Sequence, residues 1–151
     1  MSTPLVLASL IASSGLTDAQ IVDLFAHTES RYEHAAVGDS GRARSAWQMH
    51  RKAWLDVSIW RRVKKLPVYD YNMGIRDPEK ARAYAGDYIG ICAFRLNNLM
   101  GRQPTLEEVW CGWNMGVGRF YQIQFDKKKA PLPTRAGIAR MHEYMKEKGW
   151  R

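Results

Sequence analysis

Glu29 and Asp39 are the side chains that the sequence places best for acid–base chemistry. Glu29 lies in the last turn of a helix predicted over about residues 18 to 31, and a flexible loop follows it. A carboxyl there can project into a cleft between helix and loop, where apolar neighbours raise its pKa and let it protonate a glycosidic oxygen. Asp39, in the loop Gly38–Gly41, is the candidate second carboxylate, and Glu33 is the other.

Glu29 and Asp39 could each have a purely structural role instead of a catalytic one. Glu29 can be a helix-end residue that is exposed to water or paired with Arg31 or His34. Asp39 lies in a glycine turn, where an aspartate commonly accepts hydrogen bonds from nearby backbone amides.

Helix signals surround these residues and predict a mainly helical single domain over residues 1–151. Thr17–Gln20 and Thr105–Glu108 are capping boxes, and the stretch from Pro78 to Met100 has apolar residues at near-helical spacing before Gly101. Further helices are expected over about residues 50–64 and 134–147. Residues after Pro67 are expected to form a long loop, and a small β region is expected within about residues 35–50.

Composition excludes several classes of protein. The chain has 151 residues, of which 46% are hydrophobic and 25% charged, so a disordered chain and a membrane-spanning one are both disfavoured. The net charge is +8, and residues 42–65 contain eight basic residues and one acidic residue. Such a block suggests a polyanionic partner, such as nucleic acid, acidic lipid or a cell-wall polymer. The alternative is a charged surface that is exposed to water and aids solubility.

Cysteine and histidine usage gives no metal signature. The four histidines lack ligand spacing, so neither a metal nor a cofactor is expected. Cys92 and Cys111 are expected to be small buried residues, with a disulfide between them left open. The apolar N-terminus lacks the positive start of a secretory signal, so we interpret it as part of the fold and expect another export route.

Separated segments of the chain resemble the lysozyme-like lytic transglycosylases of the soluble type. The segments are Glu29-Ser30, the loop Gly38-Asp39-Ser40-Gly41, then Ser45-Ala46-Trp47-Gln48-Met49, and finally Gly112-Trp113-Asn114-Met115-Gly116. The family has Glu-Ser, a glycine-containing loop, Gly-Leu-Met-Gln and Ala-Tyr-Asn-Ala-Gly in the same order. The resemblance covers residues of about 17 to 147.

This resemblance implies an α+β lysozyme-like fold in which a small region around residues 35–50 flanks the cleft. It implies that Glu29 is the catalytic acid, with Ser30 beside it and Gln48 facing it as substrate-binding residues. Asn114 would bind the substrate near an acetamido group, and Gly116 would let the glycan approach the backbone. Trp47 and Trp113 are aromatic residues that can stack on sugar faces or fill the core.

Some positions depart from the family pattern. Ser45 stands where the family has glycine, and Trp113 stands where it has tyrosine. The family tyrosine that supports the glutamate is missing from its expected place, and Tyr88, Tyr121 and Tyr144 remain as substitutes.

The resulting expectation is an enzyme that cleaves the MurNAc-β-1,4-GlcNAc bond of peptidoglycan through Glu29 and leaves 1,6-anhydro-muramoyl ends. A hydrolytic lysozyme that uses Glu29 with Asp39 is one alternative, and a basic non-enzymatic domain that binds nucleic acid or wall polymer is another. The expected partners are glycan strands and anionic wall polymers, without nucleic acid or stable membrane insertion. A monomeric bacteriophage enzyme is expected, either a virion component or an endolysin held in the host cytoplasm before holin-type release.

Overall fold

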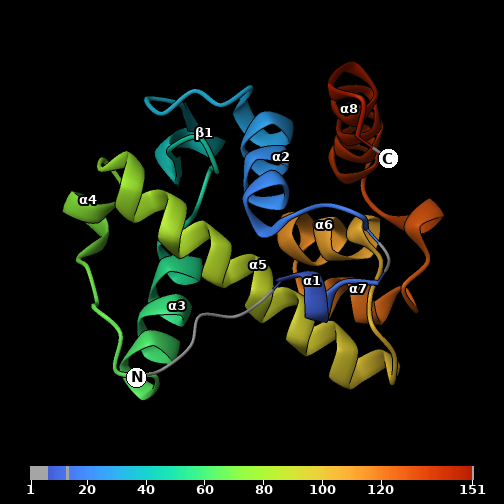
Figure 1. The fold of residues 1–151 in the computed structure, drawn as a ribbon, viewed down its shortest axis with the longest axis horizontal. Helices are drawn as coiled ribbons and strands as arrows, with labels where there is room; N and C mark the ends of the chain where they lie inside the picture. Colours follow the sequence, from blue (N-terminus) through green and yellow to red (C-terminus); the bar gives the residue numbers. More distant parts are fainter. Residues whose placement is uncertain (1–6, 13, 151) are drawn as a thin grey trace.

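The structure, a computed structural model, describes residues 7–12 and 14–150. Over this part of the chain it is mainly helical with one two-stranded antiparallel hairpin, which confirms the prediction of a helical chain with little β structure (Figure 1). The elements in chain order are α1 (Leu7–Leu10), α2 (Asp18–Ser30), β1 (Val37–Gly38), η1 (Asp39–Gly41), β2 (Ala43–Arg44), α3 (Arg51–Val63), α4 (Tyr71–Gly74), α5 (Pro78–Met100), α6 (Leu106–Met115), α7 (Val117–Gln122), η2 (Lys127–Lys129) and α8 (Leu132–Lys148).

Helix α2 begins at the predicted capping box. The Thr17 hydroxyl accepts a hydrogen bond from the Gln20 amide at 3.2 Å, and the Gln20 side chain accepts one from the Thr17 amide at 2.9 Å. The helix ends where Arg31 adopts a left-handed conformation with φ of 57°. Glu29 therefore lies in the last turn, as predicted, at the end of a helix whose apolar face is buried.

The hairpin follows α2 and is fixed to it through Trp47. Val37 pairs with Arg44 and Gly38 with Ala43, and η1 forms the tip between the two strands. The Trp47 side chain is fully buried, and its indole Nε1 donates to the carbonyl oxygen of Val22 at 2.9 Å. The core of the protein therefore holds the base of the hairpin against α2.

Helix α5 runs through the middle of the molecule and contacts α1, α2, α3, α6 and α7 (Figure 1). Asp77 caps its N-terminus, Pro78 occupies the first turn, and Gly101 ends it with φ of 72°. Trp54 of α3 stacks on Tyr84 of α5 with ring centroids 3.8 Å apart. This contact joins the hairpin side of the molecule to the central helix.

Helix α8 approaches α6 closely because Gly137 has no side chain. A Cβ atom at Gly137 would lie 2.3 Å from Cζ2 of Trp110, which is fully buried. The Trp110 indole Nε1 donates to the carbonyl oxygen of Thr134 at 3.0 Å. These contacts fix the first turn of α8 relative to α6.

The structure corrects the expected loop and decides between the two alternatives for the cysteines. The long loop expected after Pro67 contains the one-turn helix α4, because the Asp70 side chain accepts from the Met73 amide at 3.2 Å and caps a turn there. Cys92 and Cys111 are both buried and free, so the expectation of small buried residues is confirmed and they do not pair. Residues 1–6 lie outside the described part of the chain, so only α1 bears on the expectation for the N-terminus.

The described residues include no helix with both the length and the hydrophobicity needed to cross a bilayer.

Candidate active site

A cleft of about 830 Å³ lies where the end of α2, the hairpin, α3, α5 and the start of α8 meet the junction of α6 and α7. Glu29 reaches this cleft from α2, and Asp39, Gln48, Trp113, Asn114 and Gly116 line it as well. Segments that are far apart in the sequence therefore contribute side chains to one site. The structure brings together six of the eight residues predicted for the site.

Glu29 is held in the cleft by hydrogen bonds from α6. The Trp113 indole Nε1 donates to Glu29 Oε1 at 2.8 Å, and the Asn114 side chain also hydrogen-bonds to the carboxylate. Both interactions favour the ionised form, as does the charge of Arg140. Burial outweighs them and raises the pKa of Glu29 to about 7.

Aromatic residues pack around Trp113, whose indole donates a hydrogen bond to Glu29. Phe25 meets the Trp113 ring edge-on with centroids 5.3 Å apart, and the Tyr88 ring is tilted against the same indole with centroids 5.3 Å apart. Phe25 is fully buried, and Trp113 is partly buried. Glu29 is buried beside this indole, and a buried carboxylate lacks the hydration that stabilises its charge, which is the physical cause of its raised pKa.

The Asn114 amide is oriented by Thr134, a buried residue at the start of α8. The Thr134 hydroxyl donates to Asn114 Oδ1 at 2.7 Å, so the NH₂ group of Asn114 is the part left to donate elsewhere. Thr134 is not among the residues predicted from the sequence, although it borders the cleft. Gly116, next to these residues, has φ of 94°, a conformation that glycine adopts without strain.

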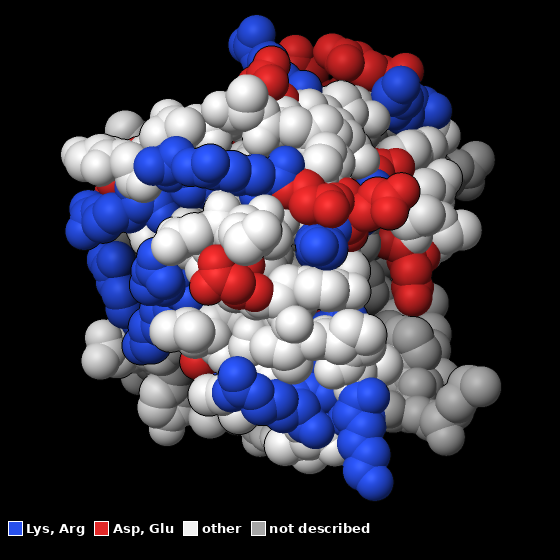
Figure 2. Space-filling view, turned by 90° about the vertical axis from the view of Figure 1, so that its left-hand side faces the viewer, with Lys and Arg blue, Asp and Glu red and all other residues white. Residues whose placement is uncertain are grey.

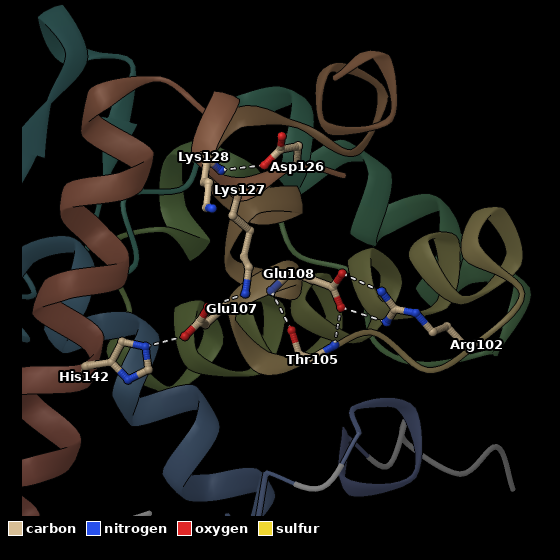
Figure 3. A network of polar contacts seen from close by, with 8 residues as sticks. All are labelled: Arg102, Thr105, Glu107, Glu108, Asp126, Lys127, Lys128 and His142. Atoms are coloured by element: carbon tan, nitrogen blue, oxygen red, sulfur yellow. Dashed lines mark hydrogen bonds and ion pairs between the residues drawn. The ribbon is translucent and has the colours of Figure 1, made fainter. Parts of the chain in front are cut away.

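A polar network at the N-terminal end of α6 joins this helix to its neighbours (Figure 3). The Glu107 carboxylate accepts from Lys127 Nζ at 2.6 Å and contacts His142 of α8. Glu108 accepts two hydrogen bonds from the Arg102 guanidinium, at 2.9 and 2.8 Å. The network ties α6 to η2 and α8, the elements that position Asn114 and its hydrogen-bond donor in the cleft.

Gln48 holds the hairpin side of the cleft in shape. Its Nε2 donates to the carbonyl oxygens of Ser45 at 2.8 Å and Ala36 at 3.1 Å. A Cβ atom at Gly38 would lie 2.4 Å from Gln48 Oε1, so the glycine makes room for this amide. Ser45, where the resembling family has glycine, has φ of 72°, a conformation in which glycine is the less strained residue.

Other carboxylates differ sharply from Glu29 in their surroundings. Asp39 lines the cleft but is exposed, and it pairs with Arg42 and His50, each at 3.1 Å. Glu33 is exposed, does not line the cleft and accepts from the Ala35 amide at 3.1 Å. Asp56 of α3 lines the cleft and was not predicted, because nothing in the sequence places α3 opposite Glu29.

Two predicted substrate-binding residues lie elsewhere. Trp47 is fully buried and has no face left for a sugar, so its role is in the core. Ser30 does not line the cleft; its hydroxyl donates to the carbonyl oxygen of Ala46 at 2.7 Å and ties the end of α2 to the hairpin. Both predictions are corrected to supporting roles, because the contacts of these side chains form only when the hairpin folds onto α2.

Of the three candidate tyrosines, Tyr88 is the one that lines the cleft. It packs against Trp113, the hydrogen-bond donor to Glu29, and burial raises the pKa of its hydroxyl. Tyr144 stacks on His27 with centroids 4.0 Å apart, and Tyr121 is exposed beside Phe125. Tyr88 therefore contacts the indole that donates to Glu29, and no hydrogen bond joins Tyr88 to Glu29 among the described residues.

No group of three or more His, Cys, Asp or Glu side chains in the described part of the chain could hold a metal ion. Comparison with models of protein families and with curated proteins found no match for this chain.

Proposed function

We propose that this protein is a lytic transglycosylase with a lysozyme-like fold, which cleaves the β-1,4 bond between N-acetylmuramic acid and N-acetylglucosamine in peptidoglycan. The observation that carries the proposal is Glu29, a carboxyl in an open cleft whose pKa is about 7. Near neutral pH a substantial fraction of this group is protonated and can act as an acid. The motifs Glu29-Ser30, Trp47-Gln48 and Trp113-Asn114 support the assignment by their order in the chain.

In the proposed reaction Glu29 first gives its proton to the glycosidic oxygen. The bond from that oxygen to C1 of the muramoyl sugar breaks, and the N-acetylglucosamine end leaves as an alcohol while the muramoyl acetamido oxygen bonds to C1. The ionised Glu29 then takes the proton of the muramoyl 6-hydroxyl. That oxygen attacks C1, displaces the acetamido oxygen and closes the 1,6-anhydro ring, which returns Glu29 to its protonated form without consuming water.

A pKa near 7 suits a residue that must act first as acid and then as base. A carboxyl with an ordinary pKa is almost fully ionised at neutral pH and cannot begin the reaction efficiently. The hydrogen bonds from Trp113 and Asn114 stabilise the carboxylate that forms after the first step. The opposing effects of burial and hydrogen bonding keep both protonation states accessible.

A hydrolytic lysozyme is the second candidate, because Asp39 lines the same cleft as Glu29. In that reaction a second carboxylate supports the oxocarbenium-like transition state or activates water. The ion pairs of Asp39 with Arg42 and His50 favour a structural role at the tip of the hairpin instead. We therefore propose the reaction that needs one carboxylate.

Purified peptidoglycan digested with wild type and with Glu29→Gln tests the proposal. Glu33→Gln is the matched control, because it removes an exposed carboxylate that lies outside the cleft. We expect wild type and the control to release soluble fragments, and Glu29→Gln to be slower by about a hundredfold or more. Equal rates in all three proteins would remove Glu29 from the mechanism, and wall binding without cleavage by wild type would favour a polymer-binding domain.

In this proposal the glycan strand is the partner, and the positive charge of the protein attracts it to anionic walls. The source that we propose is a bacteriophage, with the enzyme acting from the virion or after release from the host cytoplasm.

A further inference from the structure

A second hollow, of about 380 Å³, lies beside the candidate active site and is lined mainly by cationic side chains. It is bordered by the hairpin, the start of α3 and the end of α4. We name it the basic hollow; its charged and titratable lining residues are Arg42, Arg44, His50, Arg51, Lys52 and Arg76. None of the residues that line it in the described chain is acidic. Figure 2 looks onto the side of the molecule where α4 and the hairpin lie, and Lys and Arg side chains crowd together along part of it.

Several of these cations are held in place by the rest of the fold. Arg44 Nε donates to the carbonyl oxygen of Gly41 at 3.0 Å. The Arg51 guanidinium donates to Asn72 Oδ1 at 2.8 Å and lies over the Tyr71 ring, 4.8 Å from its centroid. These contacts leave further N–H groups of each guanidinium without a partner among the described residues. The anchored side chains lose less freedom when they bind a ligand.

Arg76 lies on the α4 side of the basic hollow and is exposed. Its side chain makes no hydrogen bond or ion pair with any residue that the structure describes. Asp39 pairs with Arg42 and His50 at the edge of the hollow, whereas Arg44, Arg51 and Arg76 have no carboxylate partner among the described residues. Like charges gathered in this way repel one another, and an anionic ligand relieves that repulsion. The electrostatics of the hollow therefore favour a ligand with one or more oxyanion groups, which guanidinium groups bind through paired hydrogen bonds.

The basic hollow adjoins the candidate active site. His50 and Lys52 line both spaces, and Asp39, on the cleft side, pairs with His50 at 3.1 Å. A polymer strand in the cleft can therefore place a side branch in the hollow without leaving the cleft. The short step from the cleft to the hollow favours an anionic group attached to the strand itself over a separate polyanion.

We propose that the basic hollow binds the carboxylate groups of the peptide branches that the peptidoglycan strand carries on its muramoyl sugars. This inference rests on the proposed function and adds a determinant of specificity to it: the protein would prefer strands with peptide branches over bare glycan. Arg51 and Arg76 supply the contacts in this proposal. Both line the basic hollow, and neither lines the cleft where Glu29 lies. Their removal should therefore weaken binding of branched strands without slowing the chemical step.

The double variant Arg51→Gln/Arg76→Gln tests this proposal against the control Arg62→Gln/Lys65→Gln. The control removes the same amount of positive charge from exposed positions that line neither space. Each protein is given peptidoglycan strands with intact peptides and strands whose peptides have been removed by an amidase. Initial rates over a range of strand concentrations separate KM from kcat.

For wild type and the control, we expect KM for branched strands to be about tenfold lower than KM for bare strands. The Arg51→Gln/Arg76→Gln variant should lose this preference while its kcat and its KM for bare strands stay at the wild-type values. A preference that survives in this variant would overturn the proposal. If the control lost the preference for branched strands to the same degree, the total positive charge of the protein, rather than the basic hollow, would set that preference.

A binding measurement tests recognition of the peptide carboxylates without depending on whether the protein cleaves peptidoglycan. NMR spectra of each protein are recorded with a free muramyl tripeptide, with the same peptide amidated at its carboxyl groups, and with a glycerol-phosphate polymer. In the wild-type protein, we expect NMR signals of residues around α3 and α4 to change position only when the tripeptide with free carboxylates is added. In the Arg51→Gln/Arg76→Gln variant, we expect no such changes. Equal binding of the amidated peptide, or tighter binding of the phosphate polymer, would refute recognition of peptide carboxylates, whereas absence of cleavage by wild type would refute the enzymatic function alone.

Discussion

Replacing Glu29 with glutamine should change the stability of the protein in a pH-dependent way. Burial raises the pKa of Glu29 from 4.5 to about 7, so the folded state binds this proton more tightly than the unfolded state does. The stability that the protonated carboxyl contributes is fully present below pH 4.5 and is lost as the pH rises through about 7. Above that pH, the ionised and buried carboxylate costs about 3 kcal/mol of folding free energy.

Glutamine keeps the shape of the protonated side chain and cannot ionise. Glu29→Gln should therefore be about 3 kcal/mol more stable relative to wild type at pH 8 than it is at pH 4. Urea unfolding of both proteins at the two pH values measures this difference, and comparison between pH values cancels any change that the amide itself causes. Glu33→Gln, which replaces an exposed carboxyl, should show almost no such dependence.

The same difference between Glu29→Gln and wild type at both pH values would contradict the reasoning. Glu29 would then have an ordinary pKa in the folded protein, and its assignment as an acid at neutral pH would lose its physical basis.

Trp113→Phe should move the alkaline limb of the kcat/KM profile upward by about one pH unit, because it removes the N–H donor that stabilises ionised Glu29; an unchanged midpoint would contradict this. Asp39→Asn should keep near-normal turnover of peptidoglycan, whereas a severe loss would favour the hydrolytic lysozyme. Gly137→Ala should lower the free energy of unfolding by about 1–3 kcal/mol, because the new methyl group meets the ring of Trp110. Urea denaturation checks the last prediction, and unchanged stability would show that α8 moves freely away from α6.

Local signals in the sequence were sufficient to predict the five longer helices, α2, α3, α5, α6 and α8, but not the short helices α1, α4 and α7. The capping boxes at Thr17 and Thr105 mark the starts of α2 and α6, and Gly101 marks the end of α5. These signals involve residues within one helical turn of each other, so they do not depend on the tertiary fold. The one-turn helix α4 was missed because it is too short to show apolar periodicity.

The candidate site was predictable where a motif specified the position of a residue. Glu29, Gln48 and Asn114 line one cleft although they come from three separate segments. Contacts across the fold cannot be read from local sequence. The sequence therefore left Trp47 open between the core and a sugar contact, and the hydrogen bond from Thr134 to Asn114 was not foreseen. A buried indole and a sugar-stacking indole have the same local sequence signal, and only packing separates them.

The mass of the fragments released from peptidoglycan tests the central claim most directly. Purified peptidoglycan is digested with the wild-type protein, and the soluble muropeptides are weighed by mass spectrometry, with the Glu29→Gln digest as the blank. The account predicts 1,6-anhydro-muramoyl ends, one water lighter than hydrolytic products, and none of them in the blank. Reducing ends at the full hydrolytic mass would contradict the single-carboxylate mechanism and bring Asp39 or Asp56 into the reaction.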